Sequence, residues 1–590
     1  MSAQAWTTVA VLLLVLALLV RGRTSPAAVV FGGAVALLVL GVVTPEEAFS
    51  GFSNPAPITV AALYVLAAGV ERTGALSPVL TRVLGRTGRY RRPLLRVTVP
   101  TAAASAFLNN TPIVAMLVPP VQSWARRRQL SPSKLLMPIS FAAVLGGTLT
   151  VIGTSTNLVV SGQMGRMGLE QIGFFEVGRL GLPITLVGLV VMVALAPAVL
   201  PSRRSAREEM AVAGRDYAVE MVVDRGGAVD GRTVEDAGLR NLGGAFLAAL
   251  DRDGDTLAPV SPDTRLQGGD RLRFVGPVRR VVGLHETPGL TSAEKKHVVD
   301  LQDPTVRYFE VVVGSRSPLL GRSLKDVGFR AAYQAAVLGI HRSGELLQGP
   351  LGTETLRQGD TLMVVADQDW RGRWMDKPDF LLIAGLDGAP PTVSSRAWIP
   401  VLTLLAVVVL AATGLLPILQ GALLGALVLV LTRVLTPLQA RRAVDLEVIV
   451  VIAGSFGLAA AMSSSGLAGS LAGLLVGTFG GLGTWGVVLG VVLATMVLTE
   501  LVTNNAAALL MLPVAVPAAL EAGLDPRGLA IAVAVAASAS FLTPVGYQTN
   551  MMVYGPGGYR FTDYARLGWS LSLLVLVLTV VLTPLLWPSP

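Results

Sequence analysis

Apolar runs of helical length cover most of the chain outside one long hydrophilic stretch in the middle. Such runs predict membrane-spanning helices, because about 20 apolar residues in a helix cross the hydrocarbon core of a bilayer. Several runs are short for a full span but still come close to that thickness. The uninterrupted runs lie near 5–20, 27–43, 57–71 and 180–200 in the first half, and near 397–414, 417–432, 446–465 and 568–587 in the second.

Two further apolar segments are interrupted by amide-rich clusters with similar surroundings. The first cluster is Asn109-Asn110-Thr111 within 93–125, and the second is Thr503-Asn504-Asn505 within 485–520. Polar groups are costly in hydrocarbon unless they pair or line a cavity. One such cluster alone could join neighbouring helices, but a repeated cluster predicts a duplicated binding site. Each cluster follows a hydroxyl residue, Ser105 or Thr499, and each half has a second break farther on, Gly153–Asn157 in 135–163 or Gly546–Asn550 in 527–553.

The charge pattern predicts that the second half is inverted relative to the first. Arginines flank the 93–125 segment on both sides, which fits a re-entrant hairpin better than a single span. Five spans plus one hairpin in each half give an odd number of crossings, so the halves enter the membrane from opposite sides. With the N-terminus outside, the arginine clusters and the hydrophilic stretch become cytoplasmic. Inverted repeats with broken helices are typical of secondary transporters.

Residues 201–396 form the hydrophilic stretch and predict a duplicated soluble insert. Alternating apolar residues predict strands, and the two copies run roughly over 216–284 and 307–376. Both contain Gly-Arg-[Thr/Ser]-[Val/Leu]-x-Asp and close with Leu-x-x-Gly-Asp-x-Leu. The predicted fold class is an α-helical polytopic membrane protein with two inverted repeats, each containing a re-entrant hairpin and an unwound helix, and with an α+β tandem cytoplasmic insert.

Composition excludes several kinds of chemistry. The chain is 52% hydrophobic and only 14% charged, against about 25% charged residues in a soluble protein. It has no cysteine, and its three histidines all lie in the hydrophilic stretch, so neither thiolate nor histidine metal sites are expected in the membrane. The net charge of +9 comes from arginine clusters beside apolar runs and does not indicate nucleic-acid binding. No nucleophile–base pair is visible, so an enzyme is not expected.

The two clusters offer oxygens and neutral donors rather than charges. Side-chain oxygens and unwound backbone carbonyls suit a small hard cation such as Na⁺. Amides, hydroxyls and helix N-termini suit an oxyanion, and no lysine or arginine lies near either cluster. Glu500 is the one carboxylate beside a cluster and has Ala106 as its counterpart. It is a candidate proton carrier, with pairing inside the bundle as the alternative.

These motifs resemble the divalent anion:sodium symporter family, in which two Ser-Asn-Thr tips on opposed hairpins each pair with an unwound helix. The resemblance covers nearly all of the membrane part, although neither tip here is a strict Ser-Asn-Thr. It implies substrate contacts from Asn109, Asn110, Thr111, Thr503, Asn504 and Asn505. It implies one sodium site from Ser105, Asn109, Asn110 and the Gly153 carbonyl, and a second from Thr499, the Val502 carbonyl, Asn504 and the Gly546 carbonyl. The supporting unwound segments are Thr154, Ser155, Thr156 and Asn157, and Tyr547, Gln548, Thr549 and Asn550.

The insert resembles two tandem RCK C-terminal domains, small regulatory modules that tend to dimerise and bind small ligands. Family members with such a pair between their halves are associated with sulfate transport. The alternative to a ligand sensor is a dimer clamp without ligand. The predicted domains are a first membrane repeat (1–200), two RCK C-terminal-like domains (205–295 and 296–385) and a second, inverted membrane repeat (396–590).

The sequence therefore predicts a secondary active transporter that takes up a divalent oxyanion, sulfate first, coupled to Na⁺ and without an organic cofactor. The expected location is the plasma or inner membrane, with the insert on the cytoplasmic side. The protein is expected to form a homodimer and to bind a small regulatory ligand through the insert. The alternatives are a dicarboxylate or metalloid-oxyanion carrier coupled to Na⁺ or H⁺, and, from other classes, an ion channel or a transport-like membrane sensor. No potassium-channel filter sequence is present, which disfavours the channel.

Overall fold

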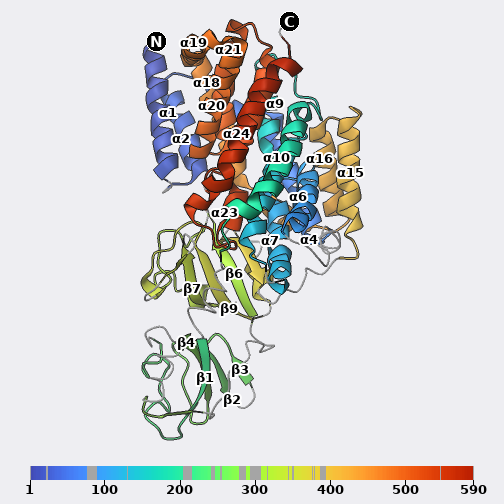
Figure 1. Ribbon diagram of the computed structural model, residues 1–590. Helices are drawn as coiled ribbons and strands as arrows, with labels where there is room; N and C mark the ends of the chain where they lie inside the picture. The colour runs from blue at the N-terminus through green and yellow to red at the C-terminus, as the bar shows by residue number, and fades with distance from the viewer. Residues whose placement is uncertain are drawn as a thin grey trace.

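The computed structural model separates a large helical part from two β-sheets stacked at one end (Figure 1). Both chain termini lie at the end of the helical part away from the sheets (Figure 1). The structure describes residues 2–21, 24–75, 90–128, 130–203, 216–240, 246–252, 255–277, 287–292, 307–314, 317–342, 345–347, 351–367, 369–374, 377, 379–385, 394–544 and 546–588.

The helices come from both ends of the chain and frame the insert. Those of the first half are α1 (Ala3–Arg21), α2 (Pro26–Val39), α3 (Pro45–Ala48), η1 (Ser50–Ser53), α4 (Pro55–Arg72), α6 (Arg91–Ser105), α7 (Asn110–Arg127), α8 (Ser133–Gly147), α9 (Ser155–Arg166) and α10 (Val177–Val199). Those of the second half are α15 (Trp398–Ala412), α16 (Ile418–Leu431), α17 (Pro437–Ala443), α18 (Leu446–Ser464), α19 (Leu467–Phe479), η4 (Gly480–Leu482), α20 (Gly483–Leu501), α21 (Asn504–Glu521), α22 (Pro526–Ser538), α23 (Gln548–Tyr554) and α24 (Phe561–Leu586).

The helical part has the composition of a protein that crosses a membrane several times. Among the described residues, six helices are long and apolar enough to span a bilayer by length and composition. Five shorter apolar helices accompany them, among them α8 and α22. Nearly every residue of α8 and of α22 is buried, so these two helices lie inside the bundle rather than on its surface. The chain breaks that follow them are therefore internal.

Four pairs of helices are separated by short non-helical stretches at the interrupted segments. Residues 106–109 separate α6 from α7, and 502–503 separate α20 from α21. Residues 148–154 separate α8 from α9, and 539–547 separate α22 from α23. Helix α19 was not among the predicted elements, although its sequence is as apolar as that of its neighbours, and its 13 residues are short for a full span.

The insert contains two five-stranded sheets with the same strand order. One sheet has the order β3-β2-β4-β1-β5 and the other β8-β7-β9-β6-β10. All pairings between these strands are antiparallel. The first sheet consists of β1 (Asp216–Val223), β2 (Phe246–Arg252), β3 (Asp255–Leu257), β4 (Arg271–Pro277) and β5 (Leu290–Ser292). The second consists of β6 (Arg307–Val313), β7 (Ala336–Arg342), β8 (Glu345–Leu346), β9 (Thr361–Ala366) and β10 (Phe380–Gly385). The described part of the insert also contains three short helices, α13 (Phe329–Tyr333), η3 (Leu351–Thr353) and α14 (Trp370–Trp374).

An ion pair at the same place in each sheet explains part of the sequence repeat. Asp270 and Asp360, from the shared Leu-x-x-Gly-Asp motif, are almost completely buried. Each carboxylate accepts two hydrogen bonds from an arginine on the adjacent hairpin, at 2.8 and 2.7 Å. These arginines are Arg252 and Arg342, and a buried carboxylate needs such a partner to remain charged.

The second sheet packs against the helical part, whereas the first lies beyond it (Figure 1). All six residues of β9 are buried, because one face of the sheet covers its own core and the other faces the helices. Val312 on the helix-facing side belongs to the same apolar cluster as α7 and α8. His341 is on that side as well, and burial lowers its pKa to about 4, so the imidazole is neutral at neutral pH.

Candidate functional site

The two amide-rich tips are held by the same pair of contacts. Ser105 Oγ contacts Asn110 Oδ1 and the carbonyl oxygen of Ala143, the latter at 2.8 Å. Thr499 Oγ1 contacts Asn504 Oδ1 at 3.4 Å and the carbonyl oxygen of Ala537 at 2.5 Å. The residue separations are 5 and 38 in both halves. The hydroxyl four residues before each cluster thus fastens the start of α7 or α21 to the buried helix α8 or α22.

Each break that follows a buried helix is bridged by one asparagine. Asn157 Nδ2 donates to the carbonyl oxygens of Gly147 and Thr150, at 3.1 and 2.8 Å. Asn550 Nδ2 donates to those of Ser540 and Thr543, at 2.9 and 3.1 Å. The separations are 10 and 7 residues in both cases. These amides satisfy carbonyl oxygens that the broken helix leaves without an intrahelical partner.

The tip of each half meets the break of the other half. Thr111 Oγ1 donates to Gln548 Oε1 at 3.3 Å, next to a hydrogen bond of 2.6 Å from Asn110 Nδ2 to the hydroxyl of Tyr547. In the reverse direction, Asn505 Oδ1 accepts from the hydroxyls of Ser155 and Thr156, at 3.1 and 3.3 Å. Residues more than 340 positions apart in the chain therefore form one polar cluster.

Four helices begin at this cluster. They are α7, α9, α21 and α23, which start at Asn110, Ser155, Asn504 and Gln548. Helix α7 packs against α23, and α9 packs against α21. Free N–H groups and the positive end of the helix dipole favour an anion at such starts. An anion among these N-termini would be stabilised without any lysine or arginine.

Oxygen atoms crowd around both glycines of the predicted sodium sites. A Cβ atom on Gly153 would lie 2.6 Å from the carbonyl oxygen of Gly147 and 2.8 Å from that of Ser105. A Cβ atom on Gly546 would lie 2.9 Å from Glu500 Oε2 and collide with Ser540 Oγ. Only glycine permits this close approach of oxygens, and hard cations prefer oxygen ligands. The residues present therefore fit a small cation.

The remaining predicted residues lie beside this cluster. Asn109 and Thr503 directly precede α7 and α21, and Thr503 is exposed. Val502 is buried in the same linker as Thr503. Thr154 and Tyr547 directly precede α9 and α23 in extended conformation. Thr549 Oγ1 is 2.8 Å from the hydroxyl of Ser140, a residue of α8 that also donates to Asn550.

Glu500 contacts the break of its own half. Its carboxylate accepts hydrogen bonds from the backbone N–H of Leu542, at 3.0 Å, and from the hydroxyl of Thr543, at 2.9 Å. Both donors lie in the non-helical stretch between α22 and α23. The carboxylate is therefore engaged in holding that stretch.

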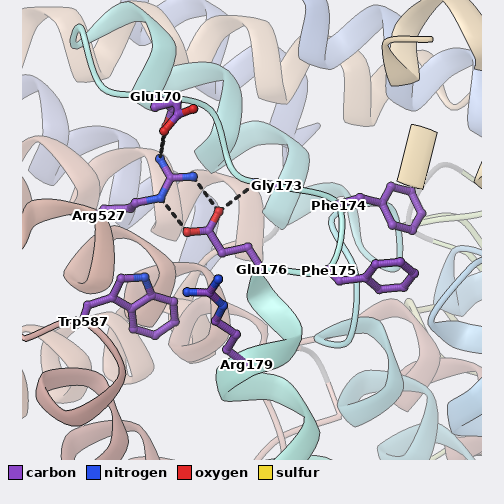
Figure 2. Close-up of a pocket in the computed structure, with 8 residues that line it drawn as sticks. All are labelled: Glu170, Gly173, Phe174, Phe175, Glu176, Arg179, Arg527 and Trp587. Carbon is purple, nitrogen blue, oxygen red and sulfur yellow. Dashed lines mark hydrogen bonds and ion pairs between the residues drawn. The ribbon is translucent and has the colours of Figure 1, made fainter. Parts of the chain in front are cut away.

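A cavity of about 670 Å³ lies elsewhere, between the α9–α10 linker and the ends of α22 and α24. Figure 2 shows Arg527 pointing toward Glu176 and Glu170 at this place. Its guanidinium donates two hydrogen bonds of 2.5 Å to Glu176 and contacts Glu170 at 3.5 Å. None of the predicted site residues lines this cavity. It is a junction between the two halves and is separate from the polar cluster.

The family of the chain follows from comparison with known proteins. A family model described as citrate transporter matches residues 14–533 and 479–588. The chain belongs to the citrate transporter family. This membership confirms the prediction of a membrane transporter rather than an enzyme, and it agrees with the apolar helices of the structure.

Three relatives match this chain over most of their own length, and two of them have names connected with sulfur. A putative sulfur deprivation response regulator of Chlamydomonas reinhardtii is 36% identical over 576 residues, which cover 95% of this chain and 98% of the relative. An uncharacterized transporter of Synechocystis is 34% identical, covering 94% of this chain and 92% of the relative. Sodium/sulfate cotransporter 1 of Chlamydomonas reinhardtii is 25% identical, covering 89% of this chain and 83% of the relative.

Sequence reasoning missed the residues that fasten the site from α8 and α22. Ser140, Ala143 and Ala537 contribute hydroxyl or carbonyl groups that no local motif distinguishes. The equal spacing of Thr150 and Thr543 from the bridging asparagines was a signal that could have found two more.

Proposed function

We propose that this transporter couples the uptake of a divalent oxyanion, sulfate first, to sodium. The observation that carries the proposal is the duplicated polar cluster, in which the tip of each half contacts the break of the other. An anion bound there would touch both halves at once, as alternating access requires. The names of two kinds of relative, sodium/sulfate cotransporters and a sulfur deprivation response regulator, support sulfate and sodium.

Sodium would supply the positive charge that the cluster itself lacks. The first site would use Ser105, Asn109, Asn110 and the Gly153 carbonyl. The second would use Thr499, Asn504 and the carbonyls of Val502 and Gly546. These groups offer only oxygen ligands, which is the donor set that a hard cation prefers. The anion would lie between Asn109, Asn110, Thr111, Thr503, Asn504 and Asn505.

The hairpins around the two tips would be re-entrant and of opposite orientation. Helix α7 runs from the cluster toward the second sheet, which Gln122 contacts near its far end. Helix α21 runs from the cluster to the end of the molecule that carries the termini (Figure 1). One bundle would then move against the other as a rigid body and expose the cluster to each side in turn.

The insert would be a cytoplasmic regulator built from two RCK C-terminal-like domains. With the termini outside the cell membrane, the sheets lie on the cytoplasmic side, where the arginine-rich loops also belong. The second sheet contacts α7, because Gln122 Nε2 lies 3.5 Å from Glu310 Oε2 of β6, and the same nitrogen donates at 2.8 Å to the carbonyl of Pro556 in the stretch after α23. A small ligand or a homodimer formed through the insert would act on the cluster through these helices.

Uptake by the purified protein in proteoliposomes tests the proposal. Labelled sulfate should accumulate under an inward sodium gradient, and Asn110→Ala or Asn504→Ala should abolish accumulation while expression is retained. Sulfate uptake that is unchanged in either variant would refute the assignment of the site.

The same assay separates the alternatives. Competition by succinate, molybdate or arsenite would reveal a dicarboxylate or metalloid-oxyanion carrier, and a proton gradient in place of sodium would reveal H⁺ coupling. Deleting 205–395 should leave some uptake in a carrier, whereas a membrane sensor whose output is the insert would show no uptake to begin with.

A further inference from the structure

The two halves of the cluster present their central amides differently. Asn110 and Asn504 occupy equivalent positions, as the first residue of α7 and of α21. Asn110 Nδ2 donates to the hydroxyl of Tyr547 at 2.6 Å. Asn504 Nδ2 has no hydrogen-bond partner within the described part of the chain, although its residue is only 6% exposed. One amide donor is thus engaged by the protein and the other is available.

The cause of this difference is the residue that precedes each second helix. Tyr547 precedes α23 with φ −143° and ψ 140°, and Thr154 precedes α9 with φ −141° and ψ 147°. The backbone is the same at both positions, so the side chains start in equivalent directions. A phenol reaches across to the tip of the other half, whereas a threonine side chain is several atoms shorter.

We propose that Tyr547 sets the size of the anion, an inference that rests on the proposed function of this site. Its ring is partly buried against the apolar core beside the cluster, and its hydroxyl accepts the hydrogen bond of the Asn110 amide. Among the described residues, the donors that remain free include the Asn504 amide, with the helix starts beside it. A compact tetrahedral oxyanion can be held from that side. An extended dicarboxylate would need both central amides, one for each carboxylate.

Hydrogen bonding to the two central amides also helps the site to distinguish tetrahedral oxyanions from dicarboxylates. A buried donor left without an acceptor is unfavourable, so the Asn504 amide favours a ligand that places an oxyanion oxygen against it. On the other side, a second carboxylate would have to displace the phenol from Asn110. Tyr547 therefore excludes long dianions mainly by the volume of its ring, and its hydrogen bond with Asn110 makes a smaller contribution.

Two substitutions at this position separate volume from hydrogen bonding. Tyr547→Thr makes the two halves alike, frees the Asn110 amide and removes the ring. Tyr547→Phe frees the amide but keeps the ring. Uptake of sulfate, molybdate, succinate and citrate is measured in proteoliposomes for the wild type and both variants. Trp569→Phe serves as the control, because this side chain is 65% exposed on α24, remote from the cluster.

The ratio of dicarboxylate to tetrahedral-anion uptake is the readout. We expect Tyr547→Thr to raise this ratio at least tenfold, and Tyr547→Phe to change it less than threefold. An unchanged ratio in Tyr547→Thr, or equal changes in both variants, would overturn the assignment of size selection to the ring. A wild type that prefers molybdate to sulfate would contradict the proposed substrate alone, since the ratio still reports on Tyr547.

Discussion

The two half-sites share the groups that hold the backbone and differ in the groups that project from it. In both, a hydroxyl fastens the tip to a carbonyl 38 residues away, and an asparagine bridges carbonyls 10 and 7 residues before it. Nothing in the binding of one anion requires the two sides to offer the same side chains. The fold requires the groups that hold the backbone in both halves. The side chains that differ between the halves are determined by the substrate and the coupling ion.

The two halves differ most clearly in the group that holds each break to the helix leading into the tip. The equivalent threonines Thr150 and Thr543 both donate to the C-terminal end of the helix that leads into the tip, α6 or α20, but their acceptors differ. Thr150 donates to the backbone carbonyl of Ala106, and Thr543 donates to the side chain of Glu500 at 2.9 Å. A carboxylate in the second half takes the place of a peptide carbonyl in the first.

Among changes that keep both central amides, the largest effect should come from adding a methyl group to the glycines of the two breaks. Gly153→Ala would press Cβ against the backbone oxygens of Gly147 and Ser105, which cannot move aside without shifting the chain. Overpacking of this kind costs about 1–3 kcal/mol, and about 1.4 kcal/mol is tenfold in an equilibrium constant. Sulfate uptake should therefore fall about 100-fold.

The matching change in the second half should be milder. Gly546→Ala would meet the side chains of Ser540, Glu500 and Thr543, which can rotate, so we expect a loss of roughly tenfold. Gly32→Ala is the control, because nothing lies within 4 Å of a Cβ atom there. Equal losses in both halves would show that the breaks do not differ in rigidity as their contacts indicate.

The sequence alone was sufficient for the features that repeat locally. Apolar runs located the long helices, and the polar clusters in them located the interruptions next to Asn110 and Asn504. The contacts that join the halves could not be predicted, because Thr111 meets Gln548 only through the packing of segments 437 residues apart. Short helices were also missed, although α3 and α17 begin with capping boxes at Thr44 and Thr436 that sequence patterns can reveal.

An intermediate effect is expected at Glu500, the carboxylate that has no counterpart in the first half. Glu500→Gln keeps an acceptor for either Leu542 N–H or the Thr543 hydroxyl but removes the charge. If the side chain replaces a peptide carbonyl, sodium-driven uptake should fall by about fivefold or less, since a hydrogen bond to a charged group is stronger by about 1 kcal/mol than a neutral one. The measurement is initial uptake rate against external pH. Uptake that loses its dependence on a proton gradient in this variant would identify Glu500 as a proton carrier instead.

The smallest effect should follow from loosening the insert, whose described residues contact the helix pair α7 and α23 at the cluster. The second sheet contacts α7 through Gln122 and α23 through Gln358, whose Nε2 lies 3.1 Å from the sulfur of Met551. Gln122→Ala removes the hydrogen bond to Glu310 of β6, a contact worth about 1 kcal/mol, together with the bond to the Pro556 carbonyl inside the helical part. Because Gln122 lies at the end of α7 remote from Asn110, the maximal uptake rate should change about two- to threefold, while the KM for sulfate stays the same.

Gln4→Ala, in the exposed first turn of α1 at the opposite end of the molecule, should change neither. A change in KM would mean that the sheet shapes the binding site itself rather than the movement of the helices that begin there.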